Sequence, residues 1–129
     1  MTQHLYTYGK QEKLKSRKKI DQLFSEGKTF SVFPLKVWYL ISTGEETSVL
    51  AGVGASKRFF KKAVDRNRIK RILREAYRHQ KNILIDDCKL KNNTINIFFL
   101  YTGKELPASN LFTEMIKALQ KIIASNETD

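Results

Sequence analysis

The chain has 129 residues, of which 24 are Lys or Arg and 13 are Asp or Glu, giving a formal net charge of +11. Hydrophobic residues make up 41% of it, which is enough for one packed core and too much for a disordered chain. No apolar stretch is long enough to span a bilayer, and Met1 to Lys10 do not resemble a secretory signal. A lone cysteine, Cys88, cannot form an internal disulfide, so we expect a reducing, cytoplasmic setting.

The first predicted element is a helix over residues 17–26. Ser16 can cap its N-terminus, and Gly27 occupies the C′ position that follows the last helical residue. Ile20, Leu23 and Phe24 follow i, i+3, i+4 spacing and therefore share one face of this helix.

Two strands are predicted next, over residues 35–42 and 48–55, and Gly44-Glu45-Glu46-Thr47 between them favours a hairpin turn. Pro34 marks the edge of the first strand or the end of a short extra strand around residues 29–32.

The second half of the chain predicts a helix over residues 63–80, an apolar strand over 95–101 and a last helix to about Ala124. Ser109 or Asn110 can cap that last helix. Its apolar stripe consists of Leu111, Phe112, Met115, Ile116, Leu119, Ile122 and Ile123. The order of helices and strands is typical of a two-layer α+β domain, with helices against one sheet.

Positive charge is concentrated in residues 57–81, which hold eleven basic side chains and two acidic ones and so carry nine of the eleven net charges. A solvated basic surface is the simpler interpretation, but this clustering favours a nucleic acid partner. Within the helix over 63–80, Arg66, Lys70, Arg74 and Arg78 follow i, i+4 spacing, opposite an apolar face. Such like charges repel by a few tenths of a kcal/mol per pair, and a polyanion would offset this.

The run SKRFFKKAVDRNRIKRILREAYR, centred on Arg66-Asn67-Arg68, resembles the signature of the bacterial ribonuclease P protein. LKSRKKIDQLFSEGKTF also resembles the first helix of that family and the turn after it, and the resemblance covers about residues 14–101. Two features depart from the family pattern. Residues 59–62 replace a shorter loop that commonly contains glycine, and Ile20 stands where the first helix usually offers an aromatic residue.

The resemblance implies an αβββαβα fold in which the central βαβ crossover is left-handed, although the general rule is right-handed. Together with the length of the chain, this predicts one RNA-binding domain over residues 1–129, and the sequence at the two ends predicts that 1–13 and 125–129 are loose. The predicted contacts with the catalytic RNA are Lys57, Arg58, Lys61, Lys62, Arg66, Asn67, Arg68, Lys70, Arg71, Arg74 and Arg78. Guanidinium groups suit this role because they grip phosphate in two hydrogen bonds.

The resemblance further implies a cleft between the first helix and the sheet for the single-stranded 5′ leader of precursor tRNA. The residues predicted to line it are Lys15, Arg17, Phe24, Lys36 and Trp38. Aromatic faces stack on bases of any sequence, at about 1–3 kcal/mol per base. Core packing is the alternative for Phe24 and Trp38. Alternation along the strand places Lys36, Trp38 and Leu40 together on one face, which favours a cleft for Trp38.

The sequence offers no catalytic or metal-binding constellation. Glu45-Glu46 and Asp86-Asp87 suit solvated turns, His4 stands in the N-terminal segment, and His79 ends a helix where a cation suits the dipole. We therefore expect no catalytic residue and no metal ligand in the protein. The resemblance implies that Mg²⁺ is held mainly by the RNA subunit and the substrate.

The resemblance thus implies the protein subunit of an endoribonuclease whose catalytic centre lies in the RNA and whose product is the matured 5′ end of tRNA. The expected partners are the catalytic RNA and precursor tRNA, without a membrane or a small-molecule substrate. Two alternatives are a basic ribosomal or RNA-chaperone protein, which would lack a stacking cleft, and a DNA-binding module, which would normally be dimeric.

Overall fold

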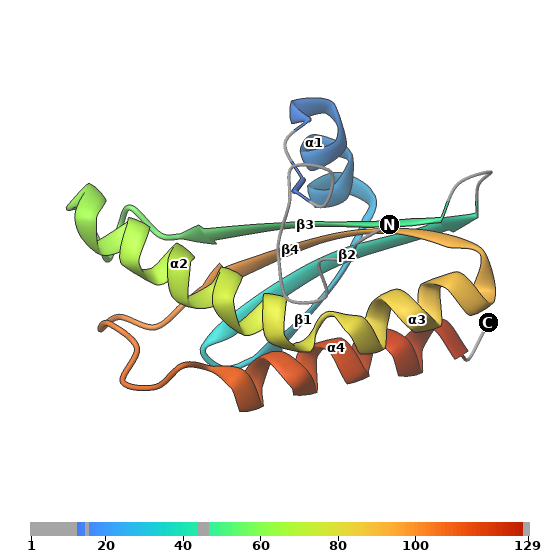
Figure 1. The fold of residues 1–129 in the computed structure, drawn as a ribbon. Helices are drawn as coiled ribbons and strands as arrows, with labels where there is room; N and C mark the ends of the chain where they lie inside the picture. Colours follow the sequence, from blue (N-terminus) through green and yellow to red (C-terminus); the bar gives the residue numbers. More distant parts are fainter. Residues whose placement is uncertain (1–12, 15, 44–46, 128–129) are drawn as a thin grey trace, which may run out of the picture.

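The computed structural model describes residues 13–14, 16–43 and 47–127. Its elements, in chain order, are α1 (Arg17–Glu26), β1 (Lys28–Val32), β2 (Leu35–Thr43), β3 (Ser48–Ala55), α2 (Ala63–Gln80), α3 (Asn82–Lys91), β4 (Asn93–Tyr101) and α4 (Phe112–Glu127). The four strands form one mixed sheet, and α2, α3 and α4 cover one of its faces (Figure 1). The predicted α+β class is confirmed.

The strand order is β1-β2-β4-β3, so β4 lies between two strands that are neighbours in sequence. It runs antiparallel to β2 and parallel to β3. The predicted hairpin between β2 and β3 is therefore wrong, because these strands do not pair; residues 44–46 lie outside the described part of the chain. The turn between β1 and β2 does join paired strands, with Phe33 and Pro34 at its tip.

Side-chain burial explains why β4 takes the central position. Ile95, Ile97 and Phe99 are fully buried on the face covered by α2, α3 and α4, while Phe98 and Leu100 are half-buried on the other face. A strand that is apolar on both faces gains most by having a neighbour on each side. β3 has less apolar surface to bury, because its face on the α1 side of the sheet carries Gly52 and Gly54.

Helix α1 lies on the opposite face of the sheet from the other three helices (Figure 1). It adds a small third layer to the expected two-layer arrangement. Ser16 caps it as predicted, accepting a hydrogen bond from the Lys19 N–H at 3.3 Å. Gly27 follows it with φ −74°, so the glycine is not required for a left-handed backbone. A Cβ there would lie 2.5 Å from the Leu23 carbonyl oxygen, so glycine is required for space.

Helix α3 is an element that the sequence analysis missed. It follows α2 after the single residue Lys81 and buries Leu84 and Cys88, so Asp86 and Asp87 lie in a helix rather than a turn. Its apolar residues are not confined to one face, since Ile83 and Leu90 are exposed, and this makes its periodicity weak. Asn92, with φ 53°, ends it by donating its backbone N–H to the Cys88 carbonyl. A left-handed Asn is a recognised helix stop, and the Asn92-Asn93 pair was the available signal.

The ends of the chain are more ordered than expected where they are described. Helix α4 continues to Glu127 instead of ending near Ala124, and the hydroxyls of Ser125 and Tyr39 share a hydrogen bond of 2.7 Å. Lys13 bridges to Ala51 on β3, while residues 1–12 lie outside the described part. The left-handed sense of the β3–β4 crossover stays a prediction from the resemblance.

Cys88 is fully buried and donates its thiol to the Asn93 carbonyl at 2.7 Å. Burial raises the pKa of this thiol, which keeps it protonated and unreactive. Within the described residues, no helix has both the length and the apolar character needed to cross a membrane.

Candidate nucleic-acid interface

Helix α2 presents the predicted division between an apolar and a basic face. Ile69, Leu73, Ala76 and Tyr77 are buried against the core. The predicted RNA contacts on this helix all retain exposure: Asn67, Arg68, Arg71 and Arg74 are exposed, and Arg66, Lys70 and Arg78 are half-buried. With Lys57, Arg58, Lys61 and Lys62, all exposed in the loop before it, they form what we call the basic surface.

Arg66 has a second role, which nothing in the sequence signals. Its Nη1 donates to the Phe60 carbonyl at 2.7 Å and to the Lys61 carbonyl at 3.0 Å. Phe60 itself is buried, with its ring centroid 6.0 Å from that of Tyr101. The loop over residues 56–62 is therefore anchored at Phe60 and tied to the first turn of α2. The backbone that carries the basic side chains of this loop is therefore held in place.

Arg78 is a second predicted contact that is already engaged within the chain. Its guanidinium donates to the Glu75 carboxylate, whose Oε1 also lies 3.2 Å from His79 Nε2. The hydrogen bond from Arg78 lowers the pKa of the Glu75 carboxyl below its ordinary value. An RNA phosphate would have to compete with this carboxylate, so we expect Arg78 to contribute less than Arg68 or Arg71.

On the α1 side of the sheet, three rings form what we call the aromatic cluster: Phe24, Trp38 and Phe98. The ring centroid of Phe24 lies 5.1 Å from that of Trp38 and 5.3 Å from that of Phe98, in edge-to-face geometry. Phe24 is 45% exposed, and the Lys36 ammonium lies 5.0 Å from the Trp38 ring. Exposed aromatic surface beside a cation suits a single-stranded nucleic acid.

Phe98 is the member of this cluster that the sequence analysis missed. It pairs with Trp38 across β2 and β4 and with Gly52 across β4 and β3. A Cβ at Gly52 or Gly54 would lie 3.0 or 2.8 Å from its ring, so these glycines make the space that the ring fills. Strand alternation together with this glycine pair was the available signal. Phe24 and Trp38 were both predicted to line the cleft, with core packing as the alternative, and each ring is in contact with the cluster while keeping part of its surface exposed.

A hollow of about 260 Å³ joins the two predicted surfaces. Ile20 of α1, Phe98 of β4 and Arg74 of α2 all line it, together with Leu14 and Gly52. Ile20 therefore faces the same space as the aromatic cluster, and Arg74 reaches it from the basic surface. Arg17 is exposed on the first turn of α1, and Lys15 lies outside the described residues.

The described residues contain no group of three or more His, Cys, Asp or Glu side chains that could hold a metal ion. Asp87 is paired with Lys91 at 3.1 Å and accepts a long hydrogen bond from Asn126 at 3.5 Å. His79 packs its ring on Phe112 at 5.0 Å. His4, Glu45 and Glu46 lie outside the described residues. The arrangement suits RNA binding by charge and stacking, and the described residues show no cluster for Mg²⁺.

Comparisons of the sequence with known proteins all match one family. The sequence model of the family described as Ribonuclease P matches residues 8–123. The ribonuclease P protein component of Porphyromonas gingivalis is 37% identical over 118 residues, covering 89% of this chain and 84% of the relative. That of Chlorobium phaeobacteroides is 31% identical over 135 residues, covering 96% and 92%.

The fold is similar to that of the Staphylococcus aureus RNase P protein, with a TM-score of 0.53 at 19% sequence identity. That match covers 90% of this chain and 94% of the solved one. At this identity the likeness concerns the fold alone.

Proposed function

Because this chain belongs to the ribonuclease P protein component family, we propose that it binds the catalytic RNA and the 5′ leader of precursor tRNA and so assists 5′ maturation. The observation that carries the proposal is the pairing of two surfaces: an anchored basic surface on α2 and its loop, and an aromatic cluster on the α1 side of the sheet. The phosphates of a folded RNA would bind the basic surface, and the bases of a single-stranded extension would bind the aromatic cluster.

The basic surface is the part that suits folded RNA. Arg68 and Arg71 are exposed, and no carboxylate other than Glu75 interrupts the body of the helix. Their guanidinium groups can bind phosphate oxygens in pairs, and Asn67 can read a ribose hydroxyl or a base edge. The helix N-terminus adds backbone N–H groups next to Lys61 and Lys62.

The aromatic cluster suits the leader, with Trp38 and Phe24 as stacking faces and Lys36 and Arg17 near the phosphates. Arg74 lines the hollow between the two surfaces, where it would contact an RNA strand that runs from the basic surface to the aromatic cluster. A separate stacking surface distinguishes this proposal from a ribosomal or chaperone role.

We place the chemistry in the RNA subunit, with Mg²⁺ held by RNA and substrate phosphates, and the site of action in the cytoplasm. Mg²⁺ at such a site would activate water and neutralise the developing phosphate charge. The contribution of the protein is to bind and orient the substrate, since its described carboxylates are not gathered into a metal site.

The purified protein alone is therefore expected to leave precursor tRNA uncut. The measurement incubates labelled substrate and Mg²⁺ with protein shown to be free of RNA, beside a sample containing the RNA subunit. Specific 5′ processing by the RNA-free protein would contradict the placement of the catalytic centre.

Binding to the RNA subunit should depend steeply on salt. If about five phosphates are neutralised, log K should fall against log salt with a slope of about −3.5 to −4.5. Arg71→Ala should make the slope shallower by somewhat less than one unit. Lys89→Ala, which removes an exposed charge from α3, should leave the slope unchanged and is the matched control. A wild-type slope near zero would rule out binding dominated by phosphate contacts.

A further inference from the structure

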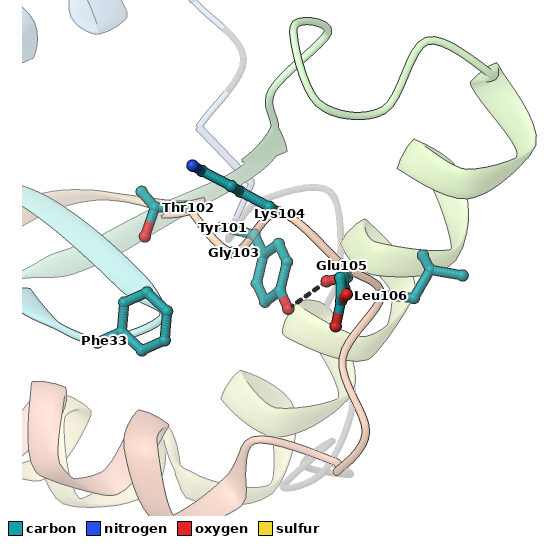
Figure 2. Close-up of a pocket in the computed structure, with 7 residues that line it drawn as sticks. All are labelled: Phe33, Tyr101, Thr102, Gly103, Lys104, Glu105 and Leu106. Carbon is teal, nitrogen blue, oxygen red and sulfur yellow. Dashed lines mark hydrogen bonds between the residues drawn. The ribbon is translucent and has the colours of Figure 1, made fainter.

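Three loops meet at the end of the sheet where β4 finishes. Tyr101, the last residue of β4, pairs with Leu35 on one side and with Ala55 on the other. This register brings together the β1–β2 turn, the loop over residues 56–62 and the segment that follows β4. Between the first and last of these lies a hollow of about 500 Å³, which we call the loop pocket (Figure 2).

The walls of the loop pocket are fixed by hydrogen bonds. The backbone N–H and the hydroxyl of Thr102 both donate to the Pro34 carbonyl, at 2.7 and 3.0 Å, which ties the two loops together. The Tyr101 hydroxyl donates to the Glu105 carbonyl at 2.7 Å (Figure 2). Gly103 lies against the Tyr101 ring, where a Cβ would come within 2.6 Å of the hydroxyl oxygen. The pocket is thus shaped before any ligand enters.

Its most exposed lining residue is aromatic. Phe33, at the tip of the β1–β2 turn, is 78% exposed although a phenylalanine normally gains by burial. Lys104, on the opposite wall, extends its ammonium to 5.8 Å from the Phe59 ring. Phe59 is itself 38% exposed, and the Arg58 guanidinium lies 5.7 Å from its ring. Two exposed rings, Phe33 and Phe59, therefore lie in one loop cluster, and the two cations lie beside Phe59.

The distribution of charge indicates which part of a nucleotide the loop pocket suits. Lys104 and Glu105 both line it, so its lining carries no net charge and does not favour a phosphate. The adjoining loop carries Lys57, Arg58, Lys61 and Lys62 without an acidic residue. A partly aromatic pocket without net charge, next to a strongly cationic loop, matches a base flanked by backbone phosphates.

We propose that the loop pocket binds an unpaired base of the RNA that lies on the basic surface, with Phe33 as the stacking face. Under the proposed function, on which this inference rests, that RNA is the catalytic subunit. The loop over residues 56–62 belongs to the basic surface and also borders the loop pocket, so one RNA strand can run from the basic surface to the pocket. The leader is the less suitable occupant of the loop pocket, because the aromatic cluster proposed to bind the leader lies on the α1 face of the sheet.

The test compares Phe33→Ala, Phe33→Leu and Phe33→Trp in the full chain. The measurement is the dissociation constant for the catalytic RNA subunit of the same organism, in filter binding at fixed salt. We expect alanine to weaken binding by about tenfold, the loss of one base stack, and leucine to do nearly the same. Tryptophan should restore wild-type affinity or improve on it, because its face is larger. The salt slope should stay unchanged in all three, since no phosphate contact is removed.

The outcomes separate this inference from the proposed function. If wild-type protein fails to bind the RNA subunit, the proposed function itself is wrong. If it binds and Phe33→Ala binds equally well, only the loop-pocket assignment is wrong. If Phe33→Leu binds as tightly as wild type, the contact is apolar and not a base stack. If affinity is lost only for substrate with a long leader, the ligand of the loop pocket is the leader and not the RNA subunit. Sedimentation that shows self-association dependent on Phe33 would assign the surface to a second copy of this chain.

Discussion

Replacing Arg66 and Arg68 together with alanine is expected to weaken assembly with the RNA subunit by about two orders of magnitude. Each charge-assisted hydrogen bond contributes about 1.5–3 kcal/mol, and 1.4 kcal/mol corresponds to a factor of ten. Arg66 adds a further effect, because its removal frees the Phe60 and Lys61 carbonyls and unties the loop over residues 56–62. The measurement is the dissociation constant of the protein–RNA complex.

Single replacements divide this loss into its two causes. Arg68→Ala removes an exposed charge and should cost about tenfold without changing the melting temperature. Arg66→Ala should also lower the melting temperature, because the loop loses its tie to α2. The matched control is Lys89→Ala with Lys117→Ala, which removes two exposed charges from α3 and α4 and should bind as wild type. An equal loss in this control would show that net charge matters and the position does not.

Trp38→Ala is expected to affect the substrate rather than assembly. If the indole stacks on a leader base, the affinity gained from a leader of several nucleotides should fall by about 1–3 kcal/mol. Association with the RNA subunit should stay near normal, since Trp38 lies on the α1 side of the sheet and the basic surface lies on α2. The measurement is the affinity of the assembled enzyme for substrates that differ only in leader length.

Thermal melting must accompany this assay because Trp38 also contacts Phe24 and Phe98. Removal of a packed aromatic side chain costs about 3–5 kcal/mol of fold stability. Phe24→Leu is the matched variant, since it keeps apolar volume beside Trp38 but removes a stacking face. A large drop in melting temperature with both functions failing together would make Trp38 a packing residue and leave the path of the leader without its main support.

Local patterns in the sequence were sufficient for most helices and strands and for their faces. The 3.6-residue period of residues 63–80 predicted an apolar face opposite the arginines, and in the structure helix α2 covers those residues and buries Ile69, Leu73 and Ala76. Strand alternation likewise put Trp38 and Lys36 on the face opposite Val37 and Tyr39. These properties depend on neighbours three or four residues away along a helix, or two along a strand, and such neighbours are visible in one sequence.

Relations between distant segments were decided only in the folded chain. The insertion of β4 between β2 and β3 replaced a hairpin that the intervening turn residues favoured, because an apolar strand gains more by pairing on both sides. The position of Phe98 beside Trp38 and the bonds from Arg66 to the preceding loop have the same origin. Each joins groups whose meeting depends on how the sheet is assembled, and burial of apolar surface determines that assembly across the whole chain.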